Sequence, residues 1–203
     1  MIEPVVFDGR VARLEPLASA HVAALAAAAQ ESRDTYGFTS VPDGAEATRS
    51  YVDAALADQA NGVALPFVVC DRARDLVVGT TRFLDIECWD EADTPTVVEI
   101  GSTWLAASAQ RTGINTECKY LLLRHAFDGW HVHRVTLKTD ARNLRSRQAI
   151  ERIGAQFEGV RRAHTVAADG GVRDSAYYSI VQSEWPAVEQ HLCALMARGP
   201  VPR

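Results

Sequence analysis

The stretch VVEIGSTWLAASAQRTGINTECKYLLLRHAF, residues 97–127, decides how this chain folds. Its first part, VVEIGSTWL at 97–105, is rich in β-branched side chains and predicts a strand, whereas its last part has the apolar spacing of a helix. A second strand, RVTLKTD at 134–140, and a second helix, SRQAIERIG at 146–154, follow it. Because a strand, helix, strand order within one sheet needs a crossover connection, the two strands are predicted to be parallel neighbours.

The remaining segments predict one α/β domain that spans residues 1–203. No repeat, low-complexity tract or linker rich in Gly, Pro or Ser divides the chain. The predicted sheet is mixed and mostly antiparallel, with one central parallel pair and helices flanking it. The additional strands are expected at 10–17, 65–71, 76–87 and in a hairpin over 155–182 that turns at Asp169-Gly170-Gly171, and the additional helices at 19–32, 44–61 and 183–197.

The composition is that of a globular protein and disfavours several classes of partner. Of the 203 residues, 47% are hydrophobic and 23% are charged, which suits one substantial core. The formal net charge of -5 gives no general basic surface for a phosphate backbone, so we expect no nucleic-acid partner. The apolar runs are too short to span a bilayer and no leader pattern precedes them, so we expect no membrane partner and a cytoplasmic location. Four scattered cysteines are expected to be reduced and packed in the core: Cys70, Cys88, Cys118 and Cys193.

The turn between the first strand and its helix, SAQRTGIN at 108–115, has two interpretations. It is a tight connection, or it is an anion site at a helix N-terminus. The first N–H groups of a helix lack intrahelical acceptors and lie at the positive end of the helix dipole. Gly113 would let a phosphate approach the backbone closely, and Arg111 would add a cationic side chain. The turn alone leaves both interpretations open.

Four segments together indicate a family. Gln110, Arg111 and Gly113 fit the pattern Q/R-x-x-G-x-G/A between strand and helix, although Asn115 stands where that pattern has Gly or Ala. TDARNLRSRQAIERIGAQFEG at 139–159, GRVARLEPL at 9–17 and VRDSAYYSIVQSEWP at 172–186 supply the other three segments. In this order they resemble the GNAT superfamily of acyl-CoA-dependent N-acetyltransferases. The last two are most similar to the branch that acetylates the N-terminal alanine or serine of ribosomal proteins.

The resemblance implies a fold whose two parallel strands splay apart, with the pantetheine arm of acetyl-CoA between them. The pyrophosphate would lie at the helix start, and an N–H near Leu105 would bind the thioester oxygen. Asn143 would hydrogen-bond the pantetheine arm and Ser146 would contact the cofactor near its sulfur; alternatively, these two residues only cap the helix that follows them. The implied acetyl-CoA-binding residues are Trp104, Leu105, Ala106, Ala107, Gln110, Arg111, Thr112, Gly113, Ile114, Asn115, Asn143 and Ser146.

Two residues are predicted to move protons during acetyl transfer. Glu99 lies in an apolar strand, where burial raises the pKa of a carboxyl group, so it is the predicted base for the acceptor amine. The alternative is an edge-strand position facing solvent, or an ion pair with an arginine such as Arg82. Ser146 is the predicted acid, because a hydroxyl beside sulfur can protonate the departing thiolate. Tyr177 and Tyr178 alternate across a strand, so one is expected in the core and the other toward solvent or the acceptor cleft.

The implied activity is transfer of an acetyl group from acetyl-CoA to a primary amine by direct attack in a ternary complex. A protein N-terminal α-amine is the first expected acceptor and a small-molecule amine the second, while a homodimer is left open. The acceptor loops are expected at 31–45 and around Asp169. His131 and His133 have no nearby Asp, Glu or Cys partner in the sequence, so no metal is expected. The alternative function is a non-catalytic acyl-CoA-binding or sensing module.

Overall fold

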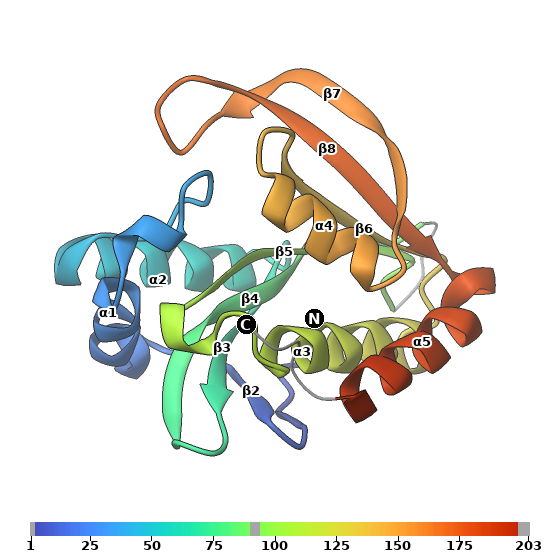
Figure 1. Cartoon of the computed structure of the whole chain (residues 1–203), viewed down its shortest axis with the longest axis horizontal. Coiled ribbons are helices and arrows are strands. Elements are labelled where there is room, and N and C mark those ends of the chain that lie inside the picture. Colours follow the sequence, from blue (N-terminus) through green and yellow to red (C-terminus); the bar gives the residue numbers. More distant parts are fainter. Residues whose placement is uncertain (1–2, 90–93, 199–203) are drawn as a thin grey trace.

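The computed structural model describes residues 3–89 and 94–198. Its strands form a single eight-stranded sheet in the order β1-β2-β3-β4-β5-β6-β8-β7 (Figure 1). Within these residues every neighbouring pair is antiparallel except β5 and β6, which are parallel. The predicted mixed sheet with one parallel pair is therefore confirmed. The strands are β1 (Phe7–Asp8), β2 (Ala12–Pro16), β3 (Leu65–Asp71), β4 (Leu76–Glu87), β5 (Val97–Leu105), β6 (Arg134–Asp140), β7 (Gln156–Val166) and β8 (Val172–Val181).

Helices cover both faces of this sheet. In Figure 1, α1 and α2 lie to the left of the sheet, whereas α3 and α5 lie below it and to the right. α1 packs on β4 and α2 on β3, while α3 packs on β2 and on α5, and α4 packs on β6. The α-helices are α1 (Val22–Gln30), α2 (Gly44–Ala60), α3 (Ile114–Arg124), α4 (Leu144–Arg152) and α5 (Trp185–Arg198), and short 3-10 or π turns lie at Ser19–His21, Arg33–Thr35, Ala107–Ala109, His125–Gly129 and Gln182–Glu184.

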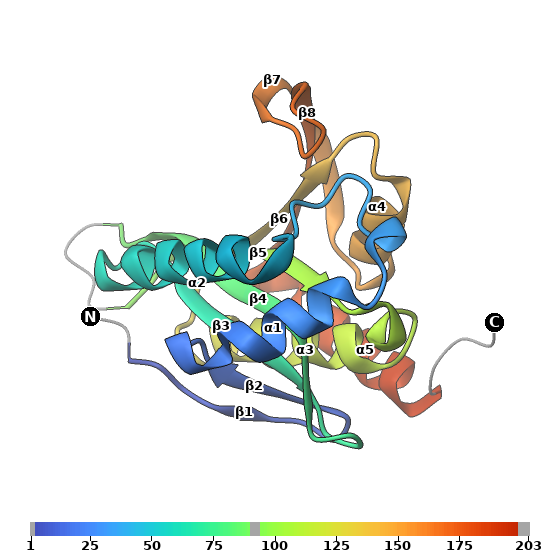
Figure 2. The ribbon, with the colours of Figure 1, turned by 90° about the vertical axis from the view of Figure 1, so that its left-hand side faces the viewer.

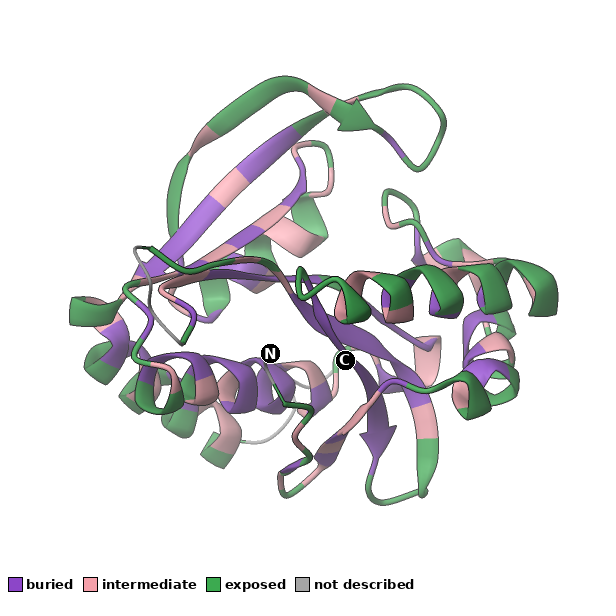
Figure 3. Cartoon of the chain, turned by 180° about the vertical axis from the view of Figure 1, so that it is seen from behind, coloured by how far each residue is buried: buried purple, intermediate pink, exposed green. Residues whose placement is uncertain are grey.

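The two helix layers account for the burial of the central strands. Every residue of β3 is buried, as expected for a strand covered on both faces. Phe67 on β3 and Phe83 on β4 pack in a T-shaped arrangement, with ring centroids 6.2 Å apart. Figure 3 shows this buried centre, with the exposed residues on the outer faces of the helices. The core thus holds β4 and β5 rigidly, which matters for the residues that β5 presents.

The β7–β8 hairpin projects beyond the helix-covered part of the sheet (Figure 2). β7 is an edge strand, and all of its residues are exposed or half-buried. Its pairing with β8 shifts register near Gly159 and again before Thr165, next to Ala163, which has a left-handed φ of 46°. Gly170, with φ 80°, closes the turn that the sequence predicts. The hairpin therefore forms an exposed arm beside β6.

Some local details differ from the sequence prediction. α4 begins at Leu144 and not at Ser146, because the Asn143 side chain accepts a hydrogen bond from the Ser146 N–H at 3.0 Å and caps the helix earlier. Cys70 and Cys118 are buried as expected, but Cys88 and Cys193 are exposed, so the expectation that all four lie in the core was wrong. In the part of the chain that the structure describes, no helix has the length and apolar character needed to cross a membrane.

Candidate active site

The parallel pair β5–β6 separates halfway along its length. The two strands are paired only at Val97–Arg134, Val98–Val135 and Glu99–Thr136. β5 then continues to Leu105 and β6 to Asp140 without pairing to each other. The backbone of β5 beyond Glu99 therefore has one side free of a strand partner within the described residues, as the splayed arrangement requires.

A β-bulge in β5, next to this gap, changes the direction in which the following side chains point. Ser102 has a left-handed φ of 46°, and the register with β4 shifts at the same point. Beyond the bulge, Trp104 contacts Tyr36 from the α1 side, with ring centroids 6.1 Å apart. Thr103 points the other way and accepts a hydrogen bond from Lys119 of α3 at 2.7 Å. The bulge thus decides which side chains of β5 face each helix layer.

Glu99 lies at the mouth of this gap and is only 3% exposed. Because β5 is a central strand, the edge-strand alternative was wrong, and the ion-pair partner is not Arg82 either. Arg82 pairs with Asp58 of α2 at 3.9 Å, whereas Glu99 Oε2 lies 2.6 Å from Nζ of Lys138 on β6. Burial raises the pKa of Glu99 to about 7, and the ammonium of Lys138 opposes that rise. A carboxyl group with this pKa can accept a proton at neutral pH.

Because Gly101 has no side chain, the Glu99 carboxylate can occupy the space beside it. A Cβ on Gly101 would lie 2.5 Å from Glu99 Oε1 and 3.0 Å from a methyl group of Leu84. Both are closer than Cβ contacts normally are, so a side chain here would push the carboxylate away. The glycine therefore lets Glu99 lie along its own strand, next to the gap.

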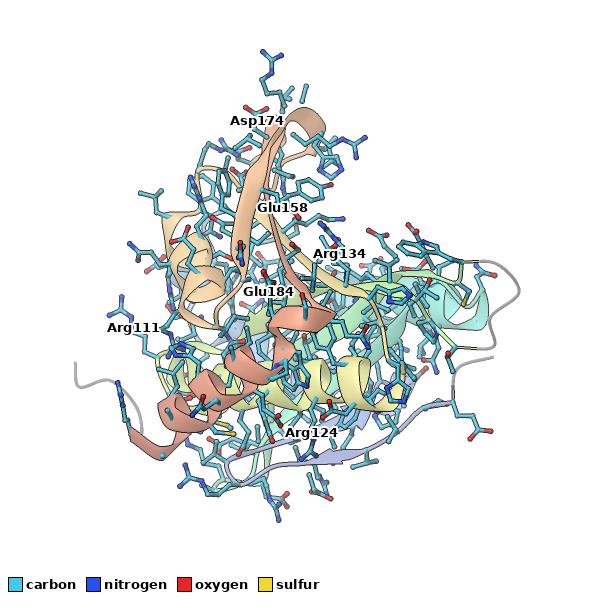
Figure 4. All side chains as sticks on the ribbon, turned by 90° about the vertical axis from the view of Figure 1, so that its right-hand side faces the viewer. Arg111, Arg124, Arg134, Glu158, Asp174 and Glu184 are labelled. Carbon is cyan, nitrogen blue, oxygen red and sulfur yellow. The ribbon has the colours of Figure 1, made fainter. Side chains whose placement is uncertain are left out.

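The turn after β5 presents unpaired N–H groups at the start of α3. Arg111 has a left-handed φ of 59°, and Gly113 is the N-cap of α3 with an ordinary helical φ of -71°. In residues 3–89 and 94–198, the N–H groups of Arg111, Thr112 and Gly113 have no hydrogen-bond acceptor. A Cβ on Gly113 would meet only Val11, at 3.7 Å, so neither packing nor φ requires glycine there. Figure 4 shows Arg111 at the outer edge of the molecule.

Other residues of this turn are engaged within the protein. The Gln110 amide donates to Thr35 Oγ1 at 3.0 Å and to the Leu105 carbonyl at 2.8 Å, and it accepts from Arg145 of α4. Gln110 thus ties the end of β5 to the segment before α2 and to α4. Asn115 has a side-chain oxygen that is buried without a hydrogen-bond partner among the described residues.

Asn143 and Ser146 lie at the start of α4, directly after β6. Asn143 caps α4, since its side-chain oxygen accepts a hydrogen bond from the Ser146 N–H. This bond uses the oxygen of Asn143 and leaves its side-chain NH2 as a donor for another group. Ser146 is half-buried in the first turn of α4. The start of this helix therefore offers an amide donor and a hydroxyl next to the end of β6.

The two tyrosines of β8 face opposite sides, as the alternation of a strand requires. Tyr178 is fully buried and contacts Arg147 and Glu151 of α4. Tyr177 lies on the other face, where it pairs with Lys138 across β6–β8 and contacts His164 of β7 at 3.3 Å. A shallow hollow of about 340 Å³ is also found on this face, lined by Glu158, Gly159, Val160, Arg161 and Tyr177.

An ion pair links β6 and β7 on this open face. Arg134 of β6 forms a bidentate ion pair with Glu158 of β7, and Ser179 donates to the same carboxylate (Figure 4). Arg134 and Lys138 project from the same face of β6, since alternate residues of a strand share a face. The polar face of β6, β7 and β8 therefore continues from the β5–β6 gap to the exposed hairpin.

Sequence reasoning missed two charged residues that the fold buries, Lys119 and Glu117, and a half-buried one, Lys138, that it brings to Glu99. Lys138 reaches Glu99, Lys119 is buried against Thr103, and Glu117 of α3 accepts N–H bonds from three successive residues of the β1–β2 turn. Their sequence contexts look like ordinary polar positions. Only the pairing register of β5 and β6 brings Lys138 to Glu99, and that register cannot be read from either strand alone. Within the described part of the chain, no group of three or more His, Cys, Asp or Glu could hold a metal ion.

Comparisons with known proteins agree with this geometry. The family model described as an acetyltransferase (GNAT) domain matches residues 12–156. A solved GCN5-related N-acetyltransferase from Brucella melitensis is 34% identical, with 95% of this chain and 86% of that chain covered and a TM-score of 0.82. An acetyltransferase structure from T. thermophilus is 33% identical, covering 97% of this chain and 99% of that chain, with a TM-score of 0.81.

A curated relative is matched over a shorter span. YdaF of Bacillus subtilis (strain 168), named a ribosomal N-acetyltransferase, is 34% identical over 87 residues. The match covers 43% of this chain and 46% of YdaF, so it spans less than half of that relative.

Proposed function

Since the chain belongs to the GNAT acetyltransferase family, we propose that it transfers an acetyl group from acetyl-CoA to a primary amine. The observation that carries this proposal is the early end of β5–β6 pairing at Glu99. It leaves a strand edge free for an extended ligand, with a buried carboxyl group at the point of separation. A plain parallel pair would have no such edge.

The free edge of β5 and the start of α3 fit the two parts of acetyl-CoA. Trp104, Leu105, Ala106 and Ala107 would line the pantetheine arm, whose amides can pair with strand backbone. The unpaired N–H groups of the turn at 110–115 would bind the pyrophosphate at the positive end of α3. Gly113 supports this assignment, because nothing within the protein requires a glycine at that open position.

The residues at the start of α4 would hold the other side of the arm. The free side-chain NH2 of Asn143 would donate to a pantetheine carbonyl while its oxygen caps the helix. Ser146 would lie near the sulfur. Bound acetyl-CoA would supply the activated acyl group, with its thioester carbonyl polarised by a β5 N–H near Leu105.

Chemistry would follow direct attack in a ternary complex. The neutral amine nitrogen forms a bond to the thioester carbon, the C–S bond breaks, and the electron pair leaves with sulfur as thiolate. Glu99 takes the proton that the amine gives up, directly or through water. Ser146 gives its hydroxyl proton to the thiolate and regains one from solvent, to which Glu99 releases the proton it took, so both residues return to their starting forms. The products are an amide and free CoA thiol, so atoms and charge balance.

The acceptor is proposed to be a protein N-terminal α-amine first, and a small-molecule amine second. The relative YdaF carries a name in the ribosomal N-acetyltransferase class, which supports the first choice. On the open polar face, the hollow lined by Tyr177 lies beside Lys138, which pairs with Tyr177 across β6–β8 and reaches Glu99. We propose that this face binds the acceptor.

A coupled pair of assays tests the proposal. Acetyl-CoA should raise the melting temperature of the protein, and a panel of peptides and small amines should be screened for release of free CoA thiol. Binding together with thiol release for at least one amine supports the enzyme. Binding with no turnover of any amine would favour the acyl-CoA-sensing alternative, and no binding would contradict both.

A further inference from the structure

Lys138 forms an ion pair with Glu99 and reaches that carboxylate from the neighbouring strand. β5 and β6 are last paired at Glu99–Thr136, and Lys138 is the next residue on the same face of β6. Its side chain therefore crosses the gap at the place where the strands part. Nζ lies 2.6 Å from Glu99 Oε2 and 3.2 Å from Asp85 Oδ2 of β4.

We propose that Lys138 is a positioning residue for Glu99, holding its carboxylate at the mouth of the β5–β6 gap in the ionised form that accepts a proton. This inference rests on the proposed function, in which Glu99 is the base. An unpaired carboxyl group that is buried this deeply would be protonated at neutral pH and could not take a proton from an amine. A lysine at 2.6 Å offsets that loss of hydration.

The other charged groups near Glu99 do not replace Lys138. Asp85 is an exposed acid that acts in the opposite direction, since it raises the pKa of Glu99. Arg82 of β4 is engaged with Asp58 of α2. Lys119 approaches from α3, but its ammonium is bonded to Thr103 on the opposite side of β5.

Two aromatic side chains, Tyr177 and His164, lie on the side of Lys138 away from Glu99. Tyr177 of β8 lies with its ring centroid 6.0 Å from Nζ, and His164 follows behind that tyrosine. Burial disfavours the charged form of Lys138, but Glu99 and Asp85 more than compensate and raise its pKa. Lys138 therefore stays an ammonium in the range where Glu99 titrates. The same charge disfavours a protonated amine next to it, which would help the acceptor lose its proton on arrival.

Three substitutions separate the charge of Lys138 from its bulk. Lys138→Met removes the charge and keeps the length of the side chain, Lys138→Arg keeps the charge, and Asp85→Asn removes the opposing acid. Lys138 is partly exposed, so each variant should fold, which circular dichroism checks. The first readout is the 13C titration of the Glu99 carboxyl group, identified by its absence in Glu99→Gln, and the second is the pH profile of kcat/KM.

We expect Lys138→Met to raise the Glu99 pKa by roughly 1–3 pH units and to move the acid limb of kcat/KM upward equally. Activity at pH 7 should fall about fivefold for the first such unit and about tenfold for each further one, and should recover at high pH. Lys138→Arg should stay near wild type, and Asp85→Asn should shift the titration slightly downward. An unchanged titration in Lys138→Met, or an arginine variant that behaves like the methionine variant, overturns the inference.

These outcomes can be told apart from failure of the proposed function. If wild type releases thiol and Glu99→Gln does not, the proposed base stands whatever the Lys138 variants do. If no amine is turned over, the proposed function fails, while the carboxyl titration still decides whether Lys138 controls the ionisation of Glu99.

Discussion

Two buried glutamates, Glu99 on β5 and Glu117 on α3, come from the same stretch of sequence but have different surroundings. Glu117 accepts hydrogen bonds from the N–H groups of Arg10, Val11 and Ala12, at 2.6 to 2.8 Å. Glu99 has one cationic partner among the described residues, Lys138, and lies beside a gap. The first carboxylate is enclosed by backbone, and the second faces a place where a ligand can reach it.

The difference shows that burial alone does not identify a base. The β1–β2 turn folds around Glu117 so closely that a Cβ on Gly9 would lie 2.6 Å from its carboxyl group. Three backbone N–H donors occupy both oxygens of this carboxylate and leave no position for a substrate. Glu99 instead has a pKa raised to about 7 by burial and forms an ion pair with a side chain, that of Lys138. We therefore interpret Glu117 as a structural anchor and Glu99 as the reactive group.

Replacing each of the two glutamates by glutamine tests this difference with the largest expected effect. Glu117→Gln places an NH2 group or a weaker acceptor against three buried donors, so the free energy of unfolding should fall by about 2 to 3 kcal/mol. Glu99 has a higher pKa folded than unfolded, so its contribution to stability is lost as pH rises through about 7. At pH 8 the ionised Glu99 carboxylate is therefore unfavourable in the folded protein. Glu99→Gln removes this charge, so the variant should be at least as stable as wild type at pH 8.

Urea denaturation of both variants at pH 8 makes the measurement. Equal destabilisation by the two substitutions would contradict the distinction between anchor and base. A stable Glu117→Gln variant would show that the β1–β2 turn does not depend on the carboxylate.

The next effect concerns the start of α3. Acetyl-CoA at a hundred times its Kd stabilises a protein by about 2.7 kcal/mol, which raises the Tm of a domain of this size by roughly 5–10 °C. Gly113→Glu should abolish that shift, because it places a carboxylate where the pyrophosphate would bind. Gly113→Ala is the matched control: its Cβ meets only Val11, so the variant should fold normally and keep part of the shift. A full shift in a folded Gly113→Glu variant would disprove the phosphate assignment.

A smaller effect is expected at Asn143, which both caps α4 and is proposed to bind the pantetheine arm. Asn143→Ala removes both interactions, and Asn143→Asp keeps the cap but removes the side-chain NH2 donor. We expect the alanine variant to lose about 1 kcal/mol of stability and the aspartate variant to lose little. Both should bind acetyl-CoA more weakly, by about 0.5–1.5 kcal/mol, in calorimetric titration. Normal acetyl-CoA affinity in the folded aspartate variant would show that Asn143 caps α4 and does not bind the cofactor.

The sequence predicted the strands of the site better than the contacts within it. β5 at 97–105 and β6 at 134–140 match their predicted bounds, because both segments are rich in the β-branched residues that favour strands. The start of α4 was displaced by two residues, since a single side-chain cap at Asn143 decides it. The partners of Glu99 and Glu117 depend on strand register and on a turn far away in the chain, which no local pattern encodes. The predicted cofactor and catalytic residues remain predictions.

The pH dependence of Glu99→Gln turnover tests the central claim most directly. Once an acceptor amine is known, kcat/KM of wild type should rise with pH through a limb near 7, where Glu99 ionises. The variant should lack this limb, be slower on the order of a hundredfold at pH 7, and approach wild type as pH nears the amine's own pKa, where the amine needs no base. Equal rates, or a loss that is the same at every pH, would contradict the claim that Glu99 accepts the proton.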